Sequence, residues 1–168
     1  MQTWFNFYAV IGAVAATLTG LLFVALSMNA AAALGRGSTG SRRLAEQAFE
    51  NYLAVLMVAL LALFPDMTLP SFGRVTLLVT GGWTVWVVVR AYQAAAERSA
   101  HETRLAAFRQ HLATMIGFGL LIYSAVGMAL VGKDTRDTLA AASIVLLFSA
   151  TEKAWKLLNR IAAAERAD

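Results

Sequence analysis

The chain contains no cysteine, only two prolines and few charged residues, which make up 14% of its length. Without cysteine it has no disulfide scaffold, no thiol nucleophile, no iron–sulfur cluster and no zinc site built on thiolates. The scarcity of proline and of polar runs also excludes intrinsic disorder. These absences leave a folded protein that holds together without covalent cross-links.

Apolar side chains are abundant. Of the 168 residues, 59% are hydrophobic, and the mean hydropathy is +0.63. Soluble domains of this size rarely combine such values. The composition predicts an integral membrane protein, an all-α polytopic transmembrane helix bundle that forms a single domain over residues 1–168.

Five apolar stretches approach the length that a membrane span requires. A bilayer core of about 30 Å needs about 20 helical residues. The predicted spans lie at about 8–28, 48–64, 75–93, 112–131 and 138–157. The last is the weakest, because Glu152 and Lys153 directly follow its apolar run, and a four-span alternative would leave both at the surface.

Basic residues predict the orientation of these spans. With the N-terminus outside and five spans, eleven of the fourteen Lys and Arg residues lie in the first loop or at and after the inner ends of the third and fifth spans: Arg36, Arg42, Arg43, Arg90, Arg98, Arg104, Arg109, Lys153, Lys156, Arg160 and Arg166. Cytoplasmic loops are rich in these residues, so the count favours five spans with the C-terminus inside. In the first loop, Arg36, Arg42 and Arg43 are expected to contact anionic lipid headgroups.

Small residues recur within two of the spans. Gly12, Ala16 and Gly20 follow at intervals of four and place a small-residue face along the first helix. Gly81 and Gly82 lie near the middle of the third span and predict a close helix contact or a kink. All five are interpreted as helix-packing positions. The pattern leaves open whether the first helix packs within its own bundle or against a neighbouring subunit.

A hydroxyl stripe runs along the third helix, where Thr76, Thr80 and Thr84 recur every four residues on one side. Threonine hydroxyls in membrane helices commonly donate to carbonyl groups of their own helix. The alternative is a wetted stripe that faces a pore. The three residues are therefore candidates for an ion pathway.

Three ionisable residues share one predicted depth. Counted at about 1.5 Å per residue from the outer ends of their helices, Glu50, Arg90 and Glu152 lie roughly 21 to 23 Å below the outer surface. An unpaired charge at this depth is costly, so Arg90 is expected to bond one or both carboxylates, with Asn51 as a further partner.

Two interpretations of this charged level stay open. The first is an interhelical clamp, or side chains that snorkel to the inner surface, with Glu152 instead pairing with Lys156 on its own helix. The second is an ion or proton pathway at the cytoplasmic mouth, since ionisable residues within membranes often mark such pathways.

Motifs for catalysis are incomplete. Gly35 to Gly40 matches the pattern GxGxxG, but it follows a membrane helix where a dinucleotide site requires a strand. His101-Glu102 begins like a zinc-protease helix without the second histidine. Neither histidine nor any serine has matching catalytic partners. The sequence predicts no catalytic residues, no metal site, no cofactor and no enzymatic activity.

The N-terminal third carries a family resemblance. Residues 7–12 read FYAVIG, residues 15–27 read AATLTGLLFVALS, and an arginine-containing loop leads to AEQA at 45–48. Over about the first 65 residues the chain resembles a group of small, mostly uncharacterised bacterial inner-membrane proteins, some of which carry the label modulator of the membrane protease FtsH. The resemblance implies a bacterial inner (cytoplasmic) membrane location and transfers no site residues.

Three classes of function are compatible with these features. The threonine stripe and the charged level favour a homo-oligomeric channel or carrier for small ions. The small face of the first helix and the charged helical segment 94–111 favour a non-catalytic regulatory or scaffolding subunit of a larger membrane complex, such as a membrane protease. A membrane enzyme is the third class, and it lacks a site. The expected partners are the lipid bilayer, further copies of the chain or another membrane protein, and no nucleic acid.

Overall fold

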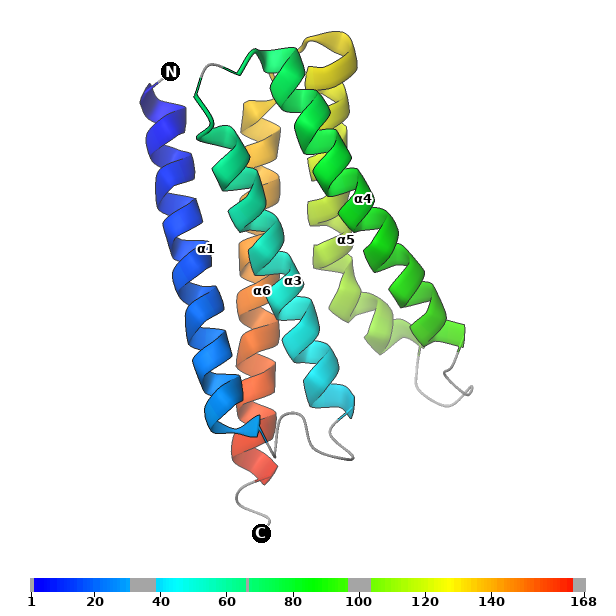
Figure 1. The fold of residues 1–168 in the computed structure, drawn as a ribbon. Coiled ribbons are helices and arrows are strands. Elements are labelled where there is room, and N and C mark those ends of the chain that lie inside the picture. Colours follow the sequence, from blue (N-terminus) through cyan, green and yellow to red (C-terminus); the bar gives the residue numbers. More distant parts are fainter. Residues whose placement is uncertain (1, 31–38, 66, 97–103, 165–168) are drawn as a thin grey trace. The chain divides into compact units, whose positions relative to one another are not determined.

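The computed structural model describes residues 2–30, 39–65, 67–96 and 104–164. Over these residues the protein is all-α, as predicted, and contains no β-strand (Figure 1). Its elements are α1 (Gln2–Met28), α3 (Thr39–Ala62), α4 (Leu69–Ala96), α5 (Arg104–Val126), the π-helical segment η1 (Gly127–Val131) and α6 (Arg136–Ala164). Each predicted span lies on one of these helices, the fourth on α5 and η1 together, apart from the last two residues of the second span.

Three helices in the described part of the chain are long and apolar enough to cross a membrane. The candidate segments are Trp4–Met28, Gly40–Ala62 and Leu112–Val131. They correspond to the first, second and fourth predicted spans. The remaining helices α4 and α6 have 28 and 29 residues, and their crossing of a membrane stays a prediction.

Local sequence explains several helix ends. α3 ends at Ala62, shortly before Pro65, which cannot continue a helix. Pro70 lies in the first turn of α4, where its missing N–H would have had no partner within the helix. η1 ends at Gly132, whose φ of 68° is a left-handed conformation that glycine adopts without strain.

The chain forms two compact units. The first unit comprises Met1–Leu63 with Leu146–Asp168, and the second unit is Phe64–Val145, so α6 contributes to both. In the first unit α1 packs along α3, and the C-terminal part of α6 completes the core (Figure 1). The buried residues of that core are Leu22, Leu44, Ala45, Ala48, Tyr52, Ala150, Leu157 and Ile161.

The packed face of α1 follows a stripe with a spacing of three and four residues. Tyr8, Ile11 and Ala15 are buried on it. Gly12 lies at its edge, where an added Cβ would sit only 2.9 Å from the Cβ of Ala59 on α3. Gly12 is therefore a close-packing position within the chain, which side chains larger than hydrogen would disturb.

The other two residues of the predicted small face lie outside this contact. Ala16 and Gly20 are exposed, and nothing lies within 4 Å of a Cβ built on Gly20. The reason is geometric, because residues four apart on an α-helix differ by about 40° in direction, so the line from Gly12 to Gly20 turns away from α3. Their contact with a neighbouring subunit stays a prediction.

In the second unit α4 packs against α5 and η1 (Figure 1). The closest approach is at Gly73, where an added Cβ would lie 2.5 Å from the backbone nitrogen of Ala129 and 2.7 Å from the Cβ of Met128. Gly81 and Gly82, by contrast, have nothing within 4 Å of a Cβ at either position. The glycine that α4 uses for close packing within this unit is thus Gly73.

Candidate functional site

A buried polar cluster lies between α3 and α6 in the first unit. Its members are Asn51 on α3 and Ser149 and Lys153 on α6, with exposed fractions of 1%, 1% and 2%. The core around them is apolar. Polar side chains buried in such surroundings are costly unless they bond to one another, and a buried ammonium most of all.

Ser149 is the centre of this cluster. The Nζ of Lys153 donates to the Oγ of Ser149 over 3.2 Å, one helical turn away on the same helix. The Nδ2 of Asn51 approaches the same oxygen from α3 at 3.4 Å. One serine oxygen therefore links a lysine on α6 to an asparagine on α3.

A second polar link joins the same two helices. The hydroxyls of Tyr52 and Thr151 lie 3.2 Å apart. Because the hydroxyl of Thr151 donates to the backbone oxygen of Leu147 over 2.9 Å, Tyr52 acts as the donor to Thr151. The ring of Tyr52 is buried in the core, so this contact supports the packing of α3 against α6.

Two carboxylates act electrostatically on the buried Lys153 side chain. Glu152 and Glu50 both attract Lys153 electrostatically, and Glu50 is half-buried next to Asn51 on α3. Glu152 is exposed and pairs with Lys156 over 2.5 Å, one turn further along α6. The cluster thus holds one buried cation with negative charge on both helices.

The structure describes the surroundings of three of the four residues assigned to the predicted charged level. Glu152 makes the local pair with Lys156, which was the alternative to a clamp with Arg90. Asn51 is a member of the polar cluster in the first unit, and Glu50 directly precedes it on α3. The side chain of Arg90 lies outside the described residues, so its pairing stays a prediction.

Lys153 is the functional candidate that sequence reasoning missed. In the sequence Lys153 stands three residues after Ala150, where the apolar run of the fifth span ends, and this position predicts one of the basic residues on the cytoplasmic side. A signal was present, because Leu146, Ala150, Lys153 and Leu157 are spaced by four, three and four residues, the period of a buried helical stripe. A lysine on that stripe is expected to point into the core.

The predicted threonine stripe of α4 bonds mainly to its own helix. The hydroxyl of Thr80 donates to the backbone oxygen of Thr76, and that of Thr84 to the backbone oxygen of Thr80, both over 2.6 Å. Thr76 is buried, and its hydroxyl has no hydrogen-bond partner among the described residues. The hydroxyls of Thr80 and Thr84 therefore agree with the interpretation in which threonines bond to their own helix, and not with a stripe that faces a pore.

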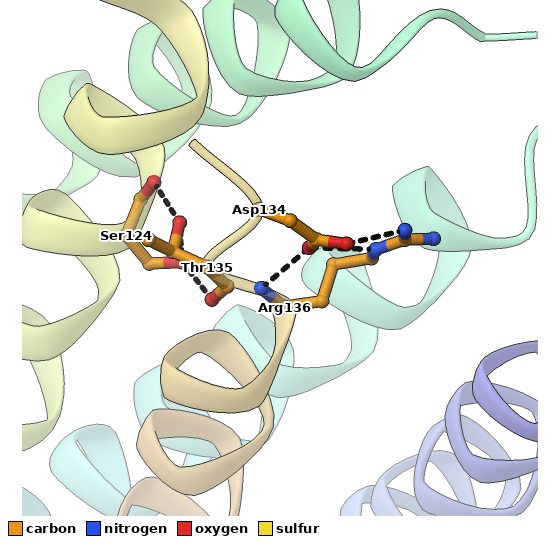
Figure 2. A network of polar contacts seen from close by, with 4 residues as sticks. All are labelled: Ser124, Asp134, Thr135 and Arg136. Atoms are coloured by element: carbon orange, nitrogen blue, oxygen red, sulfur yellow. Dashed lines mark hydrogen bonds and ion pairs between the residues drawn. The ribbon is translucent and has the colours of Figure 1, made fainter. Parts of the chain in front are cut away.

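Two reciprocal hydrogen bonds between Ser124 and Thr135 close the turn between η1 and α6 in the second unit (Figure 2). The hydroxyl of Ser124 donates to the backbone oxygen of Thr135 over 2.7 Å, and the hydroxyl of Thr135 donates to the backbone oxygen of Ser124 over 2.8 Å. Next to them, Asp134 accepts hydrogen bonds from the backbone and the guanidinium of Arg136. The bond to the Arg136 side chain is the largest influence on the Asp134 carboxyl and lowers its pKa, although burial acts in the opposite direction.

The three arginines predicted to contact lipid headgroups differ in their surroundings. Arg42 pairs with Glu46 over 3.0 Å on the surface of α3, and Arg43 is half-buried. Arg36 lies outside the described residues. The predicted lipid contact of these arginines stays a prediction.

Neither metal chemistry nor a known relative assigns a function to this arrangement. Within the described ranges, no group of three or more His, Cys, Asp or Glu side chains is placed to hold a metal ion. Comparisons of the chain with models of protein families, with curated proteins and with solved structures found no match. The functional argument therefore starts from the Lys153 cluster itself.

Proposed function

We propose that the protein is a bacterial inner-membrane protein with five spans, its N-terminus outside and its C-terminus inside, that carries protons or small ions as a homo-oligomer. The three apolar helices support a membrane location. The observation that carries the transport proposal is Lys153, which is 2% exposed and bonded to Ser149 inside the helical core.

A lysine in this position is costly for stability. Its charged form loses the water that would otherwise solvate it, and apolar side chains of similar volume often stabilise such a core equally well or better. Ionisable side chains buried in membrane helices commonly serve ion or proton movement. Lys153 is therefore the residue on which a transport function would depend.

The surroundings of Lys153 suit proton exchange. Its ammonium bears exchangeable protons, and Glu50 offers a half-buried carboxylate that acts on it electrostatically from α3. In the proposed cycle a proton taken up by one of these groups passes to the other, which then releases it, so that both return to their starting charge. The Oγ of Ser149 holds the Nζ by a hydrogen bond, and Asn51 bonds to the same oxygen. A bundle of 18.0 kDa has little interior for a private pore, so a closed ring of copies completes the pathway.

A different observation favours a second candidate, a regulatory or scaffolding subunit of a larger membrane complex such as a membrane protease. On the exposed side of α1, Ala16 and Gly20 are bordered by the large apolar side chains of Leu21, Phe23 and Val24. Small residues between large ones allow another membrane helix to approach closely. In this case the Lys153 cluster only fixes α3 against α6.

Proton flux into dye-loaded proteoliposomes, driven by a potassium diffusion potential, separates the two candidates. The transport proposal expects Lys153→Met to abolish the flux. Lys156→Met is the matched control, because it removes the same charge from an exposed position three residues further along α6. Wild-type flux in Lys153→Met, or no flux in the wild type, would exclude the proton site and favour the scaffolding function.

Glu50→Gln adds a second measurement on the same site. The change keeps the shape and the hydrogen-bonding capacity of the side chain while removing its charge. Under the transport proposal it shifts the pH dependence of the flux and leaves the melting temperature nearly unchanged. If it lowers the melting temperature and has no effect on flux, Glu50 belongs to a structural clamp.

A further inference from the structure

The end of the first unit where α3 begins and α6 ends is rich in cations. Four of them lie in the described residues, and two are neutralised by acids on their own helices. Arg42 pairs with Glu46 over 3.0 Å, and Lys156 pairs with Glu152 over 2.5 Å. These two cations are therefore already engaged.

The other two cations, Arg43 and Arg160, make no ion pair or side-chain hydrogen bond within the described part of the chain. They come from different helices, Arg43 from α3 and Arg160 from α6. The Nη1 of Arg160 lies against Gly40, at 2.5 Å from the position of an added Cβ. Gly40 and Arg43 are three residues apart and share one face of the first turns of α3, and the Arg160 guanidinium reaches this face at Gly40.

This surface carries two positive charges, and no ion pair in the described part of the chain neutralises either of them. Two guanidinium groups repel each other, and the start of a helix adds a partial positive charge. The arrangement is favourable when an anion lies between the groups. The absence of a side chain at Gly40 is what admits the Arg160 guanidinium to this place.

The surface lies at the level of lipid headgroups if α3 crosses the membrane. The candidate segment Gly40–Ala62 has 23 residues, which is slightly more than the roughly 20 residues that span the hydrocarbon core. Gly40 and Arg43 then stand at its boundary. In the proposed orientation this boundary faces the cytoplasm, where anionic phospholipids are concentrated.

We propose that Arg43 and Arg160, with Gly40 between them, bind the phosphate of an anionic phospholipid headgroup. The planar fork of each guanidinium matches phosphate oxygens and donates paired hydrogen bonds to them. Binding of one lipid also ties the start of α3 to the end of α6. The inference rests on the membrane location and is independent of ion transport.

Native mass spectrometry of the full chain in neutral detergent, titrated with phosphatidylglycerol or phosphatidylcholine, tests this site. Arg43→Gln and Arg160→Gln should each weaken the binding of phosphatidylglycerol about fivefold, the effect of one basic residue near a lipid surface. Arg42→Gln and Lys156→Gln are the matched controls and should change it less than about twofold, since these cations are already paired. Circular dichroism and thermal unfolding verify that each variant is folded.

Gly40→Ala tests the geometry without changing any charge. The added methyl group displaces the flexible end of Arg160, and the fold should persist while lipid binding weakens. Equal losses in Arg42→Gln and Arg160→Gln, or no preference for phosphatidylglycerol in the wild type, would overturn the proposal. Binding of inorganic phosphate at the same two arginines without preference for the anionic lipid would assign the site to a soluble phosphate compound and would equally overturn the lipid assignment.

Discussion

The Nζ of Lys153 lies 3.2 Å from the Oγ of Ser149, one turn earlier on α6, and both side chains are buried. The Nδ2 of Asn51 reaches the same oxygen from α3. Because the Oγ of Ser149 accepts hydrogen bonds from both buried donors, the stability of this part of the molecule depends on the Ser149 hydroxyl, although it contributes little apolar area.

Ser149→Ala should destabilise the protein by about 1 to 3 kcal/mol, the cost of weakening the hydrogen bonding of two buried donors. In a Lys153→Met background the same change should cost less, because one donor is gone. A double-mutant cycle of equilibrium unfolding in mixed micelles measures this coupling. Additive effects would show that the contact between Lys153 and Ser149 contributes nothing to stability.

The two glycines on α1 should respond in opposite ways to the same substitution. Gly12→Ala brings a methyl group to 2.9 Å from the Cβ of Ala59 and should cost about 1 to 2 kcal/mol. Gly20→Ala meets nothing within 4 Å and should be neutral, or stabilising by up to about 1 kcal/mol through helix propensity. Melting temperatures of the two variants decide this, and equal values would contradict the packing of α1 on α3.

Gly73 provides the corresponding test in the second unit. Gly73→Ala places a methyl group against the backbone of η1 and should destabilise the protein by about 2 to 3 kcal/mol. Gly81→Ala is the control on the same helix, because the space around it is open. Thermal unfolding is the measurement. A neutral Gly73→Ala would mean that α4 does not approach η1 as closely as the structure shows.

The ion pair of Asp134 and Arg136 predicts a pH dependence with a definite sign. The pKa of Asp134 is lowered below its ordinary value of 3.8 by hydrogen bonds from Arg136. The stabilisation is therefore complete above pH 3.8 and is lost as the pH falls through the lower pKa of the folded state. NMR titration of the Asp134 carboxyl should show this low value, and Arg136→Gln should return it towards 3.8.

Accessibility of tags tests the number of spans. With five spans, a tag at the N-terminus should react with an impermeant reagent from outside, and a tag after Asp168 should react only once the membrane is opened. Reaction of both tags from the same side would mean that an even number of helices crosses, so that one of α4 and α6 does not. The arrangement with five spans would then be wrong.

The helix content follows from the sequence alone, and so does the presence of three helices that are long and apolar enough to cross a membrane. In lipid or in a helical core, the backbone N–H and C=O groups of long apolar runs must bond within the segment, and a helix provides these bonds. This requirement is independent of how the helices meet. The end of α3 before Pro65 and the start of α4 next to Pro70 are equally local, because each depends on the geometry of a single proline ring. Each of the five expected spans accordingly lies on a helix.

Which side chains meet was decided by tertiary structure. Gly12 and Gly20 are equivalent in a pattern of small residues, yet only Gly12 faces α3, because a turn of about 40° every four residues separates them. Lys153 and Lys156 stand three residues apart and read alike as tail charges, yet one is buried on Ser149 and the other is paired with Glu152 at the surface. Sequence patterns specify the period of a helix, and the rotation of each helix about its own axis depends on the neighbours against which it packs.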